Sequence, residues 1–133
     1  MKPSEPKKRK SILVVDDDFA FQLKELLGYQ GYNNIFAYEN GPEAYDTIEQ
    51  GRVKYDLLIV DCSLGNNEDS RNGGDFCRHQ IEGQDIINLS NKLNPSVPII
   101  SFSCYDEKPK GSGRHIVKPI MFDALLEIIS SYP

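Results

Sequence analysis

Short runs of apolar residues alternate along this chain with stretches in which apolar residues recur every three or four positions. A continuous run of about five apolar residues is typical of a parallel strand buried on both faces, whereas the wider spacing is typical of a helix with one buried stripe. The predicted strands are residues 11–15, 34–38, 55–60, 97–102 and 115–117. The predicted helices are residues 19–27, 41–51, 86–93 and 122–129. This alternation predicts an α/β domain with a doubly wound, five-stranded parallel sheet.

Two connections in this pattern are unusual. Residues 65–82 are polar, with only three apolar side chains among eighteen, and contain Asn and Gly residues that favour a loop. The segment between the fourth and fifth strands contains Pro109, Gly111 and Gly113, so we expect no standard helix there.

The composition fits one globular domain with an acidic body. The 133 residues are 39% apolar and carry a net charge of −5. Residues 1–10 hold five basic side chains and one acidic one, and are predicted to be a disordered basic tail before a domain over residues 11–133. That body carries −9 and would repel phosphates, so direct nucleic-acid binding is not expected.

Membrane insertion and secretion are not expected either. No apolar run approaches the 18 residues of a membrane span, and no charged-then-apolar leader is present. Three cysteines at irregular spacing do not form a disulfide framework and favour a reducing compartment. We therefore predict a cytoplasmic location.

Charged and hydroxyl side chains that could bind a ligand or react lie where the predicted strands end. They are Asp16, Asp17, Asp61, Ser103 and Lys118. Carboxyl ends of parallel strands meet at one edge of the sheet, where such folds bind ligands. Gathered carboxylates repel one another, and a divalent cation such as Mg²⁺ relieves that repulsion. An ammonium and a hydroxyl beside it suit phosphoryl transfer, with an Asp as nucleophile.

Each of these residues also has a purely structural interpretation. The run Asp16-Asp17-Asp18 suits the start of the following helix, for which Asp18 is the expected N-cap. Asp61 could be a turn residue after a strand. Because one such residue ends each of several strands, in matching order, their joint occurrence favours a site.

The motifs around these residues resemble those of the receiver domain of two-component response regulators. The matching segments are Ile12–Asp17, Tyr55–Asp61, Pro98–Ser103 and Ile116–Pro119. The resemblance covers residues 11–131. It implies a flavodoxin-like (CheY-like) fold with strand order 2-1-3-4-5.

The resemblance also implies a metal site and a phosphoacceptor. Asp61 would accept a phosphoryl group from a phosphohistidine of a sensor histidine kinase or a histidine phosphotransfer protein. Asp17 and Asp61 would bind Mg²⁺ (or Mn²⁺) directly, together with the backbone carbonyl of Ser63, while Asp16 would act through water.

Three further roles follow from the same resemblance. Lys118 would pair with the phosphoryl group, and its peptide bond to Pro119 would be cis. Ser103 would hydrogen-bond the phosphoryl group and move with it as a switch residue.

The chain departs from the family pattern in three places. Gly83 best matches the glycine that opens the helix after the phosphoacceptor, because the apolar spacing after its rival, Gly74, is poorer. Residues 65–82 then form an inserted loop, which could be a lid, a partner-recognition loop or disordered. The helix between the fourth and fifth strands should be missing or reduced. His115 stands where the family usually has an aromatic switch residue, and it could swing inward or be a partly exposed strand residue.

The sequence therefore predicts a phosphorelay receiver that changes its protein partners when Asp61 is phosphorylated. It could act alone or be a piece of a larger hybrid protein. One alternative is a phosphorylation-independent pseudo-receiver that binds other proteins. A less favoured alternative is a phosphatase of the haloacid dehalogenase type, which would need a second Asp where this chain has Ser63.

Overall fold

A five-stranded parallel sheet forms the centre of the molecule. The computed structural model describes residues 10–62, 64, 81–103, 108–118 and 120–132. The strands are β1 (Ser11–Val15), β2 (Asn34–Tyr38), β3 (Leu57–Asp61), β4 (Ile99–Ser103) and β5 (Arg114–Val117). Their order is β2-β1-β3-β4-β5, and every pairing is parallel, as the motifs implied. The predicted fold class is therefore confirmed.

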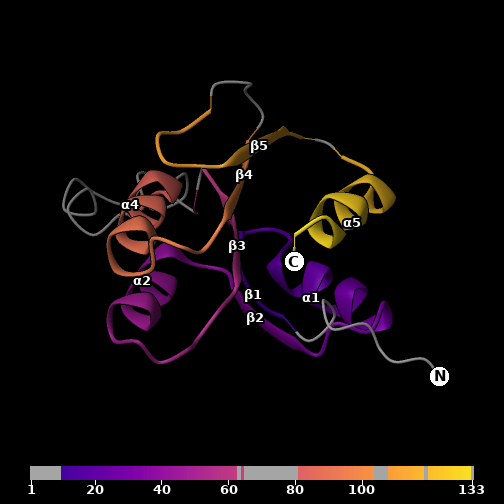
Figure 1. Ribbon diagram of the computed structural model, residues 1–133, viewed down its shortest axis with the longest axis horizontal. Coiled ribbons are helices and arrows are strands. Elements are labelled where there is room, and N and C mark those ends of the chain that lie inside the picture. Colours follow the sequence, from indigo (N-terminus) through magenta and orange to yellow (C-terminus); the bar gives the residue numbers. More distant parts are fainter. Residues whose placement is uncertain (1–9, 63, 65–80, 104–107, 119, 133) are drawn as a thin grey trace, which may run out of the picture.

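Helices cover both faces of this sheet (Figure 1). They are α1 (Ala20–Tyr29), α2 (Gly41–Glu49), α4 (Gly83–Leu93) and α5 (Phe122–Ser130). Figure 1 shows α1 and α5 on one side and α2 and α4 on the other. Alternate strand residues feed two cores, so Ile12 and Val14 pack on the α1/α5 side, whereas Leu13 and Val15 pack on the α2/α4 side. Apolar residues on both faces explain the continuous runs in the sequence.

The first two strands match their predicted ranges, whereas the other elements shift by one to three residues at one or both ends. The third and fourth strands begin and end later than predicted, so that Asp61 and Ser103 are their last residues. The third predicted helix, residues 86–93, begins three residues earlier, at Gly83. Residues 108–113 contain turns and no helix, as expected, while residues 104–107 lie outside the described part.

The start of α1 differs from the prediction that Asp18 is its N-cap. Phe19 occupies the cap position without a side-chain cap bond. Asp16 accepts instead, through Oδ1, from the backbone N–H of Asp18 at 2.9 Å and of Phe19 at 3.1 Å. A carboxylate near the first turn satisfies donors that the helix leaves free. One oxygen of a site residue therefore also anchors α1.

Lys10 does not belong to a solvated tail, which corrects one residue of that prediction. It is only 5% exposed, and its Nζ donates to the carbonyl oxygens of Ile129, at 3.2 Å, and of Tyr132. A cation at the C-terminal end of α5 is favourable because the helix dipole is negative there. Residues 1–9 lie outside the described part, so the basic disordered tail stays a prediction for them.

None of the described helices is long and apolar enough to cross a bilayer.

Candidate functional site

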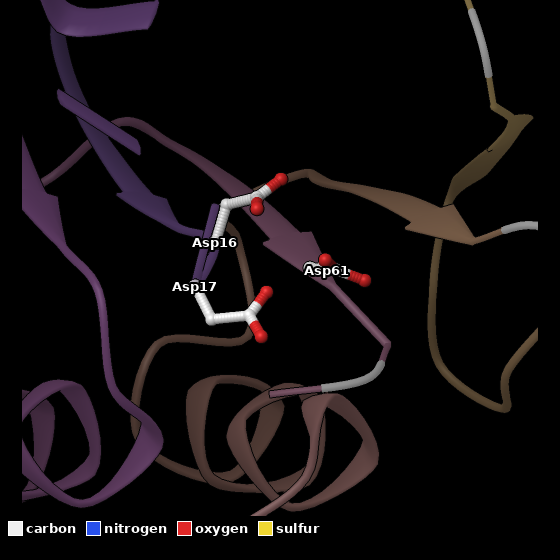
Figure 2. Close-up of side chains that lie close together, drawn as sticks. All are labelled: Asp16, Asp17 and Asp61. Carbon is white, nitrogen blue, oxygen red and sulfur yellow. The ribbon is translucent and has the colours of Figure 1, made fainter. Parts of the chain in front are cut away.

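Three carboxylates meet at the carboxyl edge of the two central strands. Asp61 ends β3, and Asp16 and Asp17 follow β1 directly. Val15 and Val60 pair across the two strands, so both strands end at the same level. One oxygen from each of the three carboxylates lies within 4.8 Å of the others (Figure 2). The structure thus brings together the three acidic residues that the sequence analysis selected.

Asp16 is the most constrained of the three. It is 3% exposed, and its Oδ1 is held by the backbone N–H groups of Asp18 and Phe19, just before α1. Its Oδ2 is buried and has no hydrogen-bond partner among the described residues. The nearest cation to that oxygen is Lys118 Nζ, at 3.6 Å. A buried carboxylate oxygen without a partner is costly, so this position favours a further cationic or water ligand.

Lys118 supplies the positive charge of the site. It directly follows β5, and its backbone N–H donates to the carbonyl oxygen of Ser103 at 2.8 Å. Its Nζ lies 2.9 Å from Asp61 Oδ2. Burial lowers the pKa of Lys118, but the hydrogen bond to Asp61 and the charges of Asp16 and Asp61 outweigh it, so the pKa is raised. Lys118 therefore stays protonated and holds Asp61 in place.

The net negative charge of this cluster favours the binding of a metal ion. Three carboxylates face one ammonium, and Asp16 and Asp61 are both buried. Close carboxylates disfavour one another's ionised form unless a cation offsets them. Mg²⁺ prefers oxygen ligands, typically one or two carboxylates plus water and phosphate. The donor set fits Mg²⁺.

Ser103 and His115 lie side by side on the neighbouring strands. Ser103 is 8% exposed, and its Oγ lies 3.3 Å from Nε2 of the His115 ring. The ring is half-buried, and its Nδ1 lies 2.7 Å from the Oγ of Ser101. His115 is therefore held against β4 through both ring nitrogens. Ser101 was missed by the sequence analysis because it stands inside an apolar strand run.

The ends of the inserted loop are pinned beside the site. Gly83 N–H donates to the carbonyl of Cys62 at 3.1 Å, and Leu64 N–H donates to Glu82 Oε1 at 3.3 Å. Glu82 and Asp85 cap α4 reciprocally. The chain therefore leaves and re-enters the described structure next to Asp61. Residues 65–80 lie outside the described part.

Gly83 opens α4 as the motif spacing predicts, and the structure supplies the reason. A Cβ at this position would lie 2.4 Å from the carbonyl oxygen of Asp61 and 2.6 Å from Cα of Cys62. Only glycine allows α4 to approach the end of β3 this closely.

Cys62 has little thiolate character. Burial raises the pKa of its thiol to about 11, with a further contribution from the charge of Asp61. Ser63, Cys104 and Pro119 lie outside the described residues.

Comparison with known proteins shows which solved structures share this fold. No protein-family model and no curated protein matches the chain. Solved structures do match. The response regulator TrrA from Thermotoga maritima, in complex with Mg²⁺–BeF, is 29% identical, covers 92% of this chain and 97% of its own, and has a TM-score of 0.69.

Two further solved structures agree. A CheY-like response regulator receiver domain from Methanospirillum hungatei is 24% identical with a TM-score of 0.73, and 92% of each chain is covered. The receiver domain of a Francisella response regulator is 21% identical with a TM-score of 0.70, covering 92% of this chain and 95% of its own. The resemblance seen in the strand-end motifs is confirmed, and the chain has the fold of a response regulator receiver domain.

Proposed function

We propose that this protein is a signalling receiver that accepts a phosphoryl group on Asp61 and thereby changes the proteins it binds. The observation that carries this proposal is the Lys118–Asp61 pair at 2.9 Å, set among two further carboxylates at the carboxyl edge of β1 and β3. A structural salt bridge would not need two additional acidic groups beside it.

The proposed reaction is a phosphoryl transfer between side chains. An oxygen of the Asp61 carboxylate attacks the phosphorus, a new P–O bond forms, and the P–N bond of a phosphohistidine donor breaks. The electron pair of the broken bond stays on the donor imidazole. In such transfers positioning and charge neutralisation dominate catalysis. Lys118 would offset the negative charge of the phosphoryl oxygens, and Ser103 would donate a hydrogen bond to one of them.

Mg²⁺ or Mn²⁺ is the proposed cofactor and would neutralise charge on the transferring group. Asp17 and Asp61 would hold the ion, together with the carbonyl of Ser63, and Asp16 would contact it through water. The buried Oδ2 of Asp16, which has no hydrogen-bond partner among the described residues, supports this assignment.

The proposed partners are a sensor histidine kinase or histidine phosphotransfer protein as donor, and a downstream protein as receiver of the signal. The solved neighbours include the receiver domain of the hybrid histidine kinase CckA, which is 24% identical. A cytoplasmic location, a cis bond before Pro119 and a partner-recognition role for the inserted loop belong to the same proposal.

Intact-protein mass spectrometry after incubation with acetyl phosphate tests this function. We expect one added phosphate in the presence of Mg²⁺, none with a chelator, and none in Asp61→Asn. Asp46→Asn is the matched control, because Asp46 is half exposed on α2 and pairs only with Arg52 among the residues the structure describes. Absence of any phosphate under all conditions would instead favour the phosphorylation-independent interaction module.

A further inference from the structure

A chain of polar side chains runs along β4 and β5 to the edge of the site. Ser112 Oγ donates to the carbonyl oxygen of Arg114 at 2.8 Å, and lies 2.8 Å from Ser101 Oγ. Ser101 Oγ lies 2.7 Å from His115 Nδ1, and His115 Nε2 lies 3.3 Å from Ser103 Oγ. Ser101 is fully buried and Ser112 is 4% exposed. Buried hydroxyls of this kind are expected to satisfy their hydrogen bonds within the network.

The number of protons available in this hydrogen-bonded network determines which ring nitrogen of His115 carries a proton. Each hydroxyl has one proton and a carbonyl can only accept. The proton of Ser112 goes to the Arg114 carbonyl, so the proton between Ser101 and Ser112 comes from Ser101. Ser101 can then only accept from His115 Nδ1, which must carry a proton.

The longer contact of Ser101 does not change this assignment. Ser101 Oγ also lies 3.3 Å from the Arg114 carbonyl, where it could share the same proton. In either arrangement the proton of Ser101 is used on the side away from the ring. Donation from Ser101 to the ring would leave one of these buried contacts without a proton.

With one ring proton, placed on Nδ1, the imidazole presents a lone pair at Nε2 toward Ser103. The 3.3 Å contact is then a bond in which Ser103 donates and His115 accepts. A phosphoryl oxygen on Asp61 is acceptor-only and needs the same hydroxyl proton. Two acceptors, His115 Nε2 and the phosphoryl oxygen, would thus compete for the one hydroxyl proton of Ser103.

We infer that His115 is a positioning residue that holds the proton of Ser103 away from the phosphoryl position, and that phosphorylation breaks the Ser103–His115 hydrogen bond. This inference rests on the proposed function, because it assigns Ser103 a phosphoryl oxygen as its second acceptor. An aromatic residue without ring nitrogens could fill the same space but could not compete for the proton.

The first test is nitrogen NMR of the histidine rings in the full chain. We expect Nδ1 of His115 to be protonated and Nε2 to be an unprotonated acceptor in the free protein. Addition of beryllofluoride and Mg²⁺ should shift Nε2 toward the value of an acceptor without a hydrogen bond, while Nδ1 stays protonated. His79 is the only other histidine, and spectra of His115→Phe assign the signals. A ring protonated at Nε2 instead of Nδ1 would overturn the inference.

The second test is the affinity for beryllofluoride in a double-mutant cycle. His115→Phe should bind beryllofluoride about three- to five-fold more tightly than the wild type. That factor corresponds to one weak hydrogen bond, which the variant no longer has to break on binding. His115→Gln, whose side-chain carbonyl can still accept from Ser103, should stay within about two-fold of the wild type. In the Ser103→Ala background, His115→Phe should have no effect, because the proton is gone.

The outcomes separate this inference from the proposed function. Failure of the wild type to bind beryllofluoride with Mg²⁺ would overturn the proposed function. Normal binding with equal affinities for wild type and His115→Phe, or an effect that persists in Ser103→Ala, would overturn the role of His115 alone. If His115→Phe does not fold, spectra of His79→Gln assign the signals instead, and the NMR test still decides the question.

Discussion

Lys118 Nζ and Asp61 Oδ2 are 2.9 Å apart, and this ion pair joins the ends of two strands that are not neighbours in the sheet. β4 lies between them, and Ser103 at its end accepts the backbone N–H of Lys118 at 2.8 Å. The pair therefore links the ends of β3 and β5 across the edge of the sheet. The ion pair needs the strand order to bring its two side chains together, and in turn it stabilises the ends of these strands.

Replacement of Lys118 by Met should destabilise the fold in a pH-dependent way. We expect a loss of about 1–2 kcal/mol in the free energy of unfolding near neutral pH, because buried carboxylates lose their cation. The folded-state pKa of Lys118 lies above its ordinary value of 10.5. The stabilisation is thus fully present below about pH 10.5 and is lost as the pH rises through the folded-state pKa.

Urea denaturation of both proteins at several pH values measures this difference. The difference in unfolding free energy between the wild type and Lys118→Met should be constant up to about pH 10 and should become smaller above about pH 10.5. Lys24→Met, on the exposed surface of α1, should show no such gap. A gap that stays constant through high pH would contradict the electrostatic explanation.

Cys62 should react slowly with alkylating reagents in the folded protein. Its pKa is raised from 9.0 to about 11, which lowers the thiolate fraction at pH 8 by about 100-fold. The same cysteine in the urea-unfolded chain provides the reference rate. Asp61→Asn should speed the reaction, because the carboxylate charge contributes to the shift.

Peptide mass spectrometry of iodoacetamide-treated protein follows this residue. The rate should rise with pH toward a midpoint near 11. A midpoint near 9 would show that the thiol is not perturbed and that only steric access slows it.

The sheet and the acidic cluster could be predicted because they depend on local patterns. Each strand is a short run that is apolar on both faces, and the residue after the run lies at the same sheet edge as its neighbours. The sheet therefore brings four side chains together independently of the loop conformations: Asp16, Asp17, Asp61 and Lys118.

Other features depend on long-range contacts that leave no local pattern. Lys10 belongs to a basic run typical of a solvated tail, but its amine meets Ile129, which is 119 residues away in the sequence. Asp18 was the expected cap because it stands just before the helical pattern, but the backbone geometry makes Asp16 the acceptor. Ser101 is one polar residue in an apolar run, and its role depends on how β5 pairs with β4.

Magnesium should stabilise the protein, and Asp17 should be needed for that effect. A metal that binds only the folded state adds about 1.4 kcal/mol when its free concentration is ten times its dissociation constant. For a domain of this size that is several degrees in melting temperature. Asp17→Asn is the informative variant because Asp16 also anchors the start of α1 through its Oδ1, so a change at Asp16 would disturb the fold as well as the metal site.

Thermal melting with a chelator and with millimolar Mg²⁺ makes this comparison. The wild type and Asp46→Asn should both gain stability with Mg²⁺, while Asp17→Asn should not. An equal gain in all three proteins would mean that the ion acts elsewhere or through ionic strength.

Gly83 should be essential for the packing of α4 against the end of β3. In Gly83→Ala the new Cβ would meet the backbone of Asp61 and Cys62 at 2.4 and 2.6 Å, and backbone atoms cannot swing aside as side chains can. Either α4 or the end of β3 must move. We expect a loss of about 2–4 kcal/mol in unfolding free energy, as for other overpacked or displaced elements.

Gly28 is the matched control for this substitution. It is also a helical glycine, in α1, but no heavy atom lies within 4 Å of a Cβ built there. Gly28→Ala should therefore raise the unfolding free energy by about 0.5–1 kcal/mol through helix propensity alone. Urea denaturation should move the two variants in opposite directions. Because the added Cβ in Gly83→Ala clashes with the backbone of Asp61, that variant should also lose phosphorylation by acetyl phosphate, whereas Gly28→Ala should keep it.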